Sequence, residues 1–192
     1  VGLMCLRQAA RGGETLLTSP LAVYNRILAE HPEHLEALHR GFPYDRKGEQ
    51  GPGEPPIGEV PIPLFHTASD GTVSARYARS YITRAEQRSG TPLPPAAKAA
   101  LDCFDRIALD PALLLEFHLR PGDIEFASNY TVFHARRGYT DHPDPARKRM
   151  MLRLWLQNDA LRRIEDDALR FGFTRFGRHG LTARQLAAAG GA

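Results

Sequence analysis

Three side chains in the last third of the sequence have the types and spacing needed to bind a metal and an acid. His134 ends an alternating, strand-like run, and a polar loop rich in Gly, Pro and Asp follows it. Arg149 comes fifteen positions later, and Arg153 four positions after that. Residues four apart in an extended chain point to the same face, so Arg153 faces any cavity that Arg149 faces. A hairpin return would then bring both guanidinium groups near His134.

The residue types indicate which chemistry such a cluster could do. A neutral imidazole is a common ligand for a divalent metal, and the planar fork of Arg suits a carboxylate better than the point charge of Lys. A lone His is usually a structural residue, so His134 is informative only in combination with Arg149 and Arg153. We therefore consider the three residues as one candidate site.

This constellation resembles the Fe(II)/2-oxoglutarate dioxygenases of the taurine-dioxygenase-like (TauD/TfdA) family. The resemblance covers most of the chain and includes the Gly12-Gly13-Glu14-Thr15 turn and the Pro121-Gly122-Asp123 turn. It implies that His134 is an iron ligand and that Arg149 binds the distal carboxylate of 2-oxoglutarate. Arg153 would then point toward the substrate.

Three further positions match the family and receive roles through the same resemblance. Thr15 would place a hydroxyl on 2-oxoglutarate; taken alone it is better explained as a β-branched strand residue, and the presence of Arg149 favours the functional role. Arg76 would face the substrate, with a surface position on a strand as the alternative. Asn129 stands before the iron-binding strand, and we count it as a substrate-binding residue.

The sequence departs from the family in one large respect. The family takes two more iron ligands from a His-x-Asp/Glu motif, shortly before a strand that resembles residues 1–6. This sequence starts at that strand, and its only His-x-acid, His31-Pro32-Glu33, lies after the Gly-Gly-Glu-Thr turn. We therefore expect a fragment that lacks its first two ligands and is inactive alone.

The resemblance implies an oxygenase that hydroxylates a small organic substrate with dioxygen and converts 2-oxoglutarate to succinate. Several arginines in one pocket favour an anionic substrate, such as a carboxylate or a sulfonate. Two alternatives come from other classes of protein. One is a non-catalytic jelly-roll module that holds a carboxylate ligand, and the other is an adaptor that uses the arginines of residues 162–178 on an acidic partner.

Composition limits the remaining possibilities. The 192 residues are 42% hydrophobic and 24% charged, which is typical of one soluble globular domain. The net charge of +3 is spread along the chain, so it gives little support to a nucleic-acid partner. No stretch has the apolar length of a membrane span. Cys5 and Cys103 lie in apolar runs and are predicted to be buried free thiols in a reducing cytoplasm. The sequence is compatible with a homo-oligomer but does not predict one.

The elements that must position the candidate site follow from hydrophobic periodicity and turn signals. They predict a mainly β protein with flanking helices, which the resemblance narrows to a double-stranded β-helix (jelly roll) of the clavaminate-synthase-like type. Residues 1–158 would form this domain, with its N-terminal part missing. Residues 159–192 would form a C-terminal extension that is partly docked on the domain and has a disordered end. Strands are expected at residues 1–7, 14–18, 40–45, 113–119, 123–126, 129–134 and 149–157, and two more are expected to form a hairpin at 60–66 and 72–77. Helices are expected at 20–31, 33–39 and 94–110. Residues 46–56 are expected to form a mobile loop.

Overall fold

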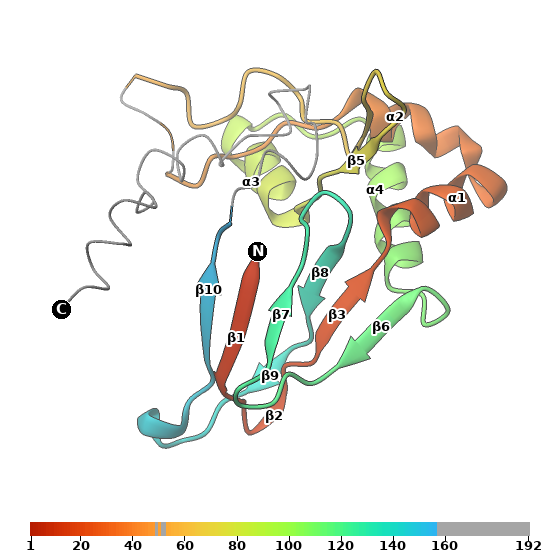
Figure 1. The fold of residues 1–192 in the computed structure, drawn as a ribbon. Coiled ribbons are helices and arrows are strands. Elements are labelled where there is room, and N and C mark those ends of the chain that lie inside the picture. Colours follow the sequence, from red (N-terminus) through yellow and green to blue (C-terminus); the bar gives the residue numbers. More distant parts are fainter. Residues whose placement is uncertain (49, 51–52, 157–192) are drawn as a thin grey trace.

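The strands near the candidate site form two antiparallel sheets of three strands each, and most helices lie to one side of them (Figure 1). A computed structural model describes residues 1–48, 50 and 53–156 of the chain. One sheet has the strand order β10-β1-β7, and the other has the order β6-β3-β8. These six strands are β1 (Gly2–Arg7), β3 (Thr15–Thr18), β6 (Leu114–Phe117), β7 (Ile124–Phe126), β8 (Phe133–Arg136) and β10 (Met150–Leu154).

Shorter elements connect and cover the two sheets. Strand β2 pairs with β9 beside the turns between the sheets, and β4 pairs with β5 in a separate hairpin. The helices include two 3-10 turns, η1 and η2. These strands are β2 (Arg11–Gly12), β4 (Phe65–Thr67), β5 (Val73–Ala75) and β9 (Tyr139–Thr140). The helices and 3-10 turns are α1 (Pro20–Glu30), η1 (Pro32–His34), α2 (Leu35–Arg40), α3 (Arg79–Ser89), α4 (Pro95–Ala108) and η2 (Pro145–Arg147).

The register of each sheet fixes which side chains share a face. In the first sheet Leu3 of β1 lies opposite Arg153 on one side and opposite Glu125 on the other. In the second sheet Leu17 of β3 lies opposite His134. Directly paired residues point to the same face, so Arg153 and Glu125 share one face of the first sheet.

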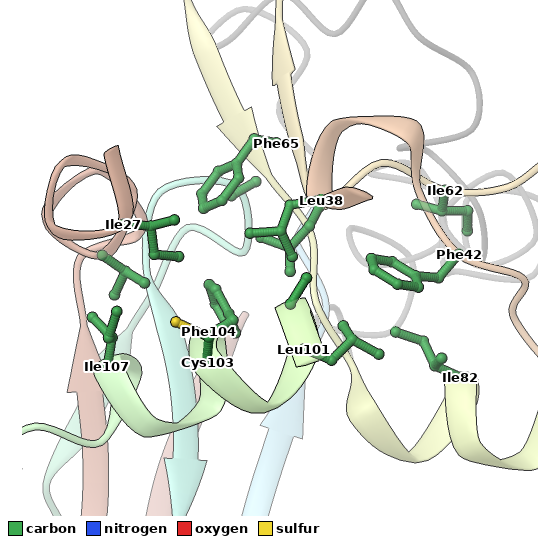
Figure 2. Packing of buried hydrophobic residues seen from close by; sticks show 14 of the residues in the cluster. Ile27, Leu38, Phe42, Ile62, Phe65, Ile82, Leu101, Cys103, Phe104 and Ile107 are labelled. Carbon is green, nitrogen blue, oxygen red and sulfur yellow. The ribbon is translucent and has the colours of Figure 1, made fainter. Parts of the chain in front are cut away.

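The hydrophobic core lies among the helices rather than between the two sheets. Leu101 and Phe104 of α4 pack with Ile27 of α1, Leu38 of α2 and Phe65 of β4, as Figure 2 shows. Strand β8 reaches this core through the ring of Phe133, whose centroid lies 5.3 Å from that of Phe104. Neighbouring strand residues point to opposite faces, so His134 points away from the helices. The core therefore fixes the orientation of β8 through the ring of Phe133.

Several predicted elements are confirmed, with altered bounds. The helix after Ser19 begins as predicted, because the Ser19 side chain accepts a hydrogen bond from the amide of Ala22 at 3.4 Å. The hairpin around Gly71 forms, but its first strand begins only at Phe65. Cys5 and Cys103 are buried free thiols. No helix among the described residues combines the length and the apolar character needed to cross a membrane.

Two local predictions were wrong. Residues 40–45 form no strand, because α2 continues to Arg40 and the segment then makes only isolated bridges at Phe42 and Asp45. Helix α3 was not predicted, since its sequence is mostly polar and only Ile82 and Ala85 are buried. An ion pair anchors the helix instead: Arg88 donates to Asp45, whose side chain is only 1% exposed, across 2.5 Å.

Two further differences concern the strands of the site. Strand β8 begins at Phe133 instead of Asn129, because the amides of Thr131 and Val132 both donate to the carbonyl of Ser128 in a turn. Strand β10 ends at Leu154. The expected extension at 159–192, with the basic adaptor segment in it, lies outside the residues that the structure describes.

The position of Leu101 generates a stability prediction. Leu101 is fully buried in the core, and Leu109, just past the end of α4, is 46% exposed. We expect L101A to lower the free energy of unfolding by about 2–5 kcal/mol, because it leaves a cavity, and L109A to change it by less than about 0.5 kcal/mol. Urea denaturation measures both values, and equal losses in the two variants would contradict this location of the core.

Candidate functional site

Arg149 and Thr15 meet at a small cavity between the two sheets. The cavity has a volume of about 10 Å³, which is close to the space of a single water, and Cys5, Gly13 and His118 also line it. Arg149 comes from the residue before β10, and Thr15 from the first residue of β3. Within the described residues the Arg149 side chain makes no ion pair and no hydrogen bond, so its charge is available to an anion.

The loop between β8 and β10 holds Arg149 in place. The Arg149 amide donates a hydrogen bond to the Asp141 carboxylate at 2.6 Å, and its guanidinium lies 5.5 Å from the centroid of the Tyr139 ring. The two glycines before Thr15 make room for this arrangement. A Cβ on Gly13 would lie 3.5 Å from Nε of Arg149, and one on Gly12 would lie 2.3 Å from the carbonyl oxygen of Gly138.

His134 and Arg153 line a second, larger cavity of about 510 Å³. Arg76, Asn129 and Trp155 contribute to the same wall, together with aromatic and aliphatic side chains. The predicted substrate-binding residues Arg153, Arg76 and Asn129 are thus brought together with the predicted metal ligand. This volume is within the range of small-molecule pockets.

The charges around His134 favour its neutral form. Partial burial of the ring lowers the pKa of His134, and the positive charge of Arg153 lowers it further. His134 nevertheless keeps an exposed surface, and it is among the residues that line the large cavity. A neutral imidazole with an accessible nitrogen is the form that binds a divalent metal.

The six predicted site residues do not share one cavity. Thr15 and Arg149 line the small cavity, whereas His134, Arg153, Arg76 and Asn129 line the large one. The sheet register connects the two groups, because Leu17 lies opposite His134 and Thr15 is two residues from Leu17 on the same strand. Thr15 and His134 therefore point to the same face of the second sheet.

The described residues contain no complete metal site around His134. No three His, Cys, Asp or Glu side chains in that part of the chain lie close enough to hold a metal ion together. An iron site of the facial-triad type needs two His and one carboxylate. The residues present therefore fit one ligand of such a site, and they fit the carboxylate of an oxo-acid at Arg149.

The sequence reasoning missed the position of Tyr139 and the burial of Glu125. Tyr139 was not considered, although an aromatic residue in a polar loop near Arg149 was a usable signal. Glu125 is buried on β7, between Ile124 and Phe126, which are exposed. Alternation of apolar and charged residues favours the opposite orientation, with the Glu in solvent, so the sequence pattern itself was misleading here.

Comparison with known proteins assigns this architecture to a family. Residues 1–155 match the family described as "Taurine catabolism dioxygenase TauD, TfdA family". The chain belongs to the TauD/TfdA family. Its members are Fe(II)- and 2-oxoglutarate-dependent oxygenases, so iron and 2-oxoglutarate are the cofactors of the family to which this chain belongs.

Two relatives in this family show the extent of the similarity. FR-33289 synthase of Streptomyces rubellomurinus is 36% identical over 157 residues, which are 80% of this chain and 45% of that protein. A uridine-5'-phosphate dioxygenase of a Streptomyces species is 30% identical over 158 residues, or 79% of this chain and 53% of that protein. The chain thus spans about half the length of these relatives.

Solved structures support the fold of this TauD/TfdA chain. An asparagine oxygenase, in complex with Fe(II), 3-hydroxyasparagine and succinate, superposes with a TM-score of 0.55 at 19% identity. The superposition covers 78% of this chain and 43% of that protein. A 2,4-D dioxygenase homologue of Burkholderia xenovorans gives a TM-score of 0.50 at 21% identity, covering 79% of this chain and 58% of the other.

The close approach at Gly12 leads to a prediction about the support of Arg149. Gly12 and Gly71 both have positive φ, but a Cβ on Gly71 would meet nothing within 4 Å. We expect G71A to lower the free energy of unfolding by about 1–2 kcal/mol through backbone strain. G12A is expected to lower it by about 1–3 kcal/mol more, because the added Cβ pushes β9 away from β2. Unfolding free energies measure the difference, and equal losses would show that the approach of Gly138 is not tight.

Proposed function

We propose that the protein containing this chain is an Fe(II)/2-oxoglutarate-dependent dioxygenase that hydroxylates a small anionic substrate. In the overall reaction, substrate, dioxygen and 2-oxoglutarate give the hydroxylated product, succinate and carbon dioxide. The observation that carries the proposal is the guanidinium of Arg149, which has no ion-pair or hydrogen-bond partner among the described residues and lies in a cavity shared with Thr15, within a chain of the TauD/TfdA family. Residues 1–192 alone are proposed to be inactive, since their described part offers one metal ligand.

Each site residue has a distinct task in this proposal. Arg149 fixes the distal carboxylate of 2-oxoglutarate by a charged fork, and Thr15 donates its hydroxyl to the same carboxylate. His134 supplies a neutral nitrogen as one iron ligand. When bound, the iron and 2-oxoglutarate supply the oxidising chemistry, and the protein orients the substrate and excludes water.

The large cavity is the proposed substrate site. Arg153 and Arg76 give it positive charge, and Asn129 adds an amide that can accept and donate hydrogen bonds. Apolar side chains such as Phe133 and Val132 line much of the remaining wall. A small organic anion with an aliphatic part would satisfy both kinds of surface.

The proposed architecture is the double-stranded β-helix of the clavaminate-synthase-like type, over residues 1–158. Two three-stranded antiparallel sheets and the structural neighbours support it. The two free cysteines are consistent with a reducing cytoplasm, which we propose as the location.

Replacement of Arg149 tests the proposal. R149K keeps the charge but loses the two-pronged contact, so we expect the dissociation constant for 2-oxoglutarate to rise by about ten- to a hundredfold. Arg137 is the matched control, because it is exposed on the strand-loop boundary and pairs with Glu116 at 2.8 Å. Isothermal titration with 2-oxoglutarate on the full-length protein measures both variants. An R149K protein that binds as tightly as R137K would contradict the role of Arg149.

A further inference from the structure

Met151 stands between the two cavities of the candidate site. It is two residues from Arg149, with which it lines the small cavity, and two residues from Arg153, which lines the large one. Alternate residues of an extended chain point to the same face, so the three side chains share one face of the first sheet. At about 3.3 Å per residue, Met151 is roughly 7 Å along the strand from each arginine. A ligand that reached from one cavity to the other would therefore cross the Met151 side chain.

Cys5 extends this surface onto the neighbouring strand. Cys5 of β1 is the register partner of Met151, and both line the small cavity next to Arg149. Cys5 is only 1% exposed. Burial raises the pKa of the Cys5 thiol, and the positive charge of Arg149 opposes this shift. The two sulfur-containing side chains thus form an apolar floor beside the guanidinium.

The residues on either side of Met151 face the other way. Met150 and Leu152 are 40% and 47% exposed, and neither is among the residues that line the two cavities. The sulfur of Met150 accepts a hydrogen bond of 3.2 Å from the guanidinium of Arg7. Met150 and Met151 are therefore the same residue type on opposite faces of one strand, which gives a matched pair for substitution.

The second sheet repeats this order of cavities along its strands. Thr15 lines the small cavity, and two residues further on Leu17 lies opposite His134, which lines the large one. The polar anchor and the proposed metal ligand are thus at different positions along the sheets, with Met151 between them on the facing sheet. 2-Oxoglutarate has a matching pattern, because two methylene groups separate its distal carboxylate from its oxo group. Apolar carbon is stabilised by contact with apolar side chains.

We propose that Cys5 and Met151 carry the carbon chain of the oxo-acid between Arg149 and His134, and that Met151 determines which length of oxo-acid is accepted. The flexible thioether of Met151 can adapt to the two methylene groups of 2-oxoglutarate. A shorter oxo-acid leaves part of this side chain without contacts, and a longer one has to displace it. This inference rests on the proposed function, because it concerns the co-substrate of the same oxygenase.

A series of 2-oxo-diacids of different length tests the proposal. Oxaloacetate has one methylene group between its oxo group and its distal carboxylate, 2-oxoglutarate has two, and 2-oxoadipate has three. Isothermal titration of the full-length protein in the presence of Mn(II) gives a dissociation constant for each acid. One methylene group in a fitted apolar site changes affinity by about ten- to two-hundredfold, so we expect 2-oxoglutarate to bind more tightly than either neighbour by that factor.

Three variants assign this length preference to Met151. M151A removes the thioether, and it is expected to reduce the preference for 2-oxoglutarate over 2-oxoadipate by about tenfold or more. M151L nearly conserves the side-chain volume and is expected to retain the preference. M150A makes the same truncation on the opposite face of the strand, and it is expected to leave all three dissociation constants unchanged.

Three results would overturn the proposal. One is equal binding of the three acids by the unsubstituted protein, another is an unchanged preference in M151A, and the third is the same change in M150A as in M151A. Melting temperatures show whether each variant is folded in the assay, and M151V makes the same test with a smaller truncation if M151A does not fold. Failure of the oxygenase proposal is seen separately, as a lack of 2-oxoglutarate binding in the unsubstituted protein.

Discussion

The pairing register of the two sheets is the constraint on which the candidate site depends. Leu3 stands opposite both Arg153 and Glu125, and Leu17 stands opposite His134. Side chains alternate along a strand, so a slip of one residue would turn each of these groups to the other face. The hydrogen bonds between strands therefore determine which charged groups reach the cavities and which reach solvent.

The helical core makes this register definite. Phe133 packs on Phe104 on the helix side of β8, so its neighbour His134 has to face the other way. Further along the chain, Asp141 and Tyr139 hold Arg149, and the glycines before Thr15 let its side chain approach. Apolar packing thus sets the orientation of the strand, and a polar loop sets the position of the cation.

The sequence contained enough information to predict some local features, but not how the two arginines are placed. The spacing of four between Arg149 and Arg153 predicted that both face one cavity, but Arg149 lines the small cavity and Arg153 lines the large one. Ser19 correctly predicted the start of α1. Such features depend on local chemistry, which a sequence shows directly.

Other features depend on contacts between distant segments, and these were not predictable. Helix α3 is held by Arg88 on a buried Asp45, more than forty residues away, so its polar sequence gave no hydrophobic pattern to follow. Glu125 is buried against its strand pattern, with Ile124 and Phe126 exposed beside it.

The central claim is that the two cavities form one site, with Arg149 holding an oxo-acid next to a metal on His134. The most direct measurement is a crystal structure of the full-length protein with 2-oxoglutarate and a divalent metal. We expect the distal carboxylate of 2-oxoglutarate on the Arg149 guanidinium and His134 coordinated to the metal. A structure with 2-oxoglutarate bound away from Arg149, or with His134 outside the metal coordination, would contradict the account.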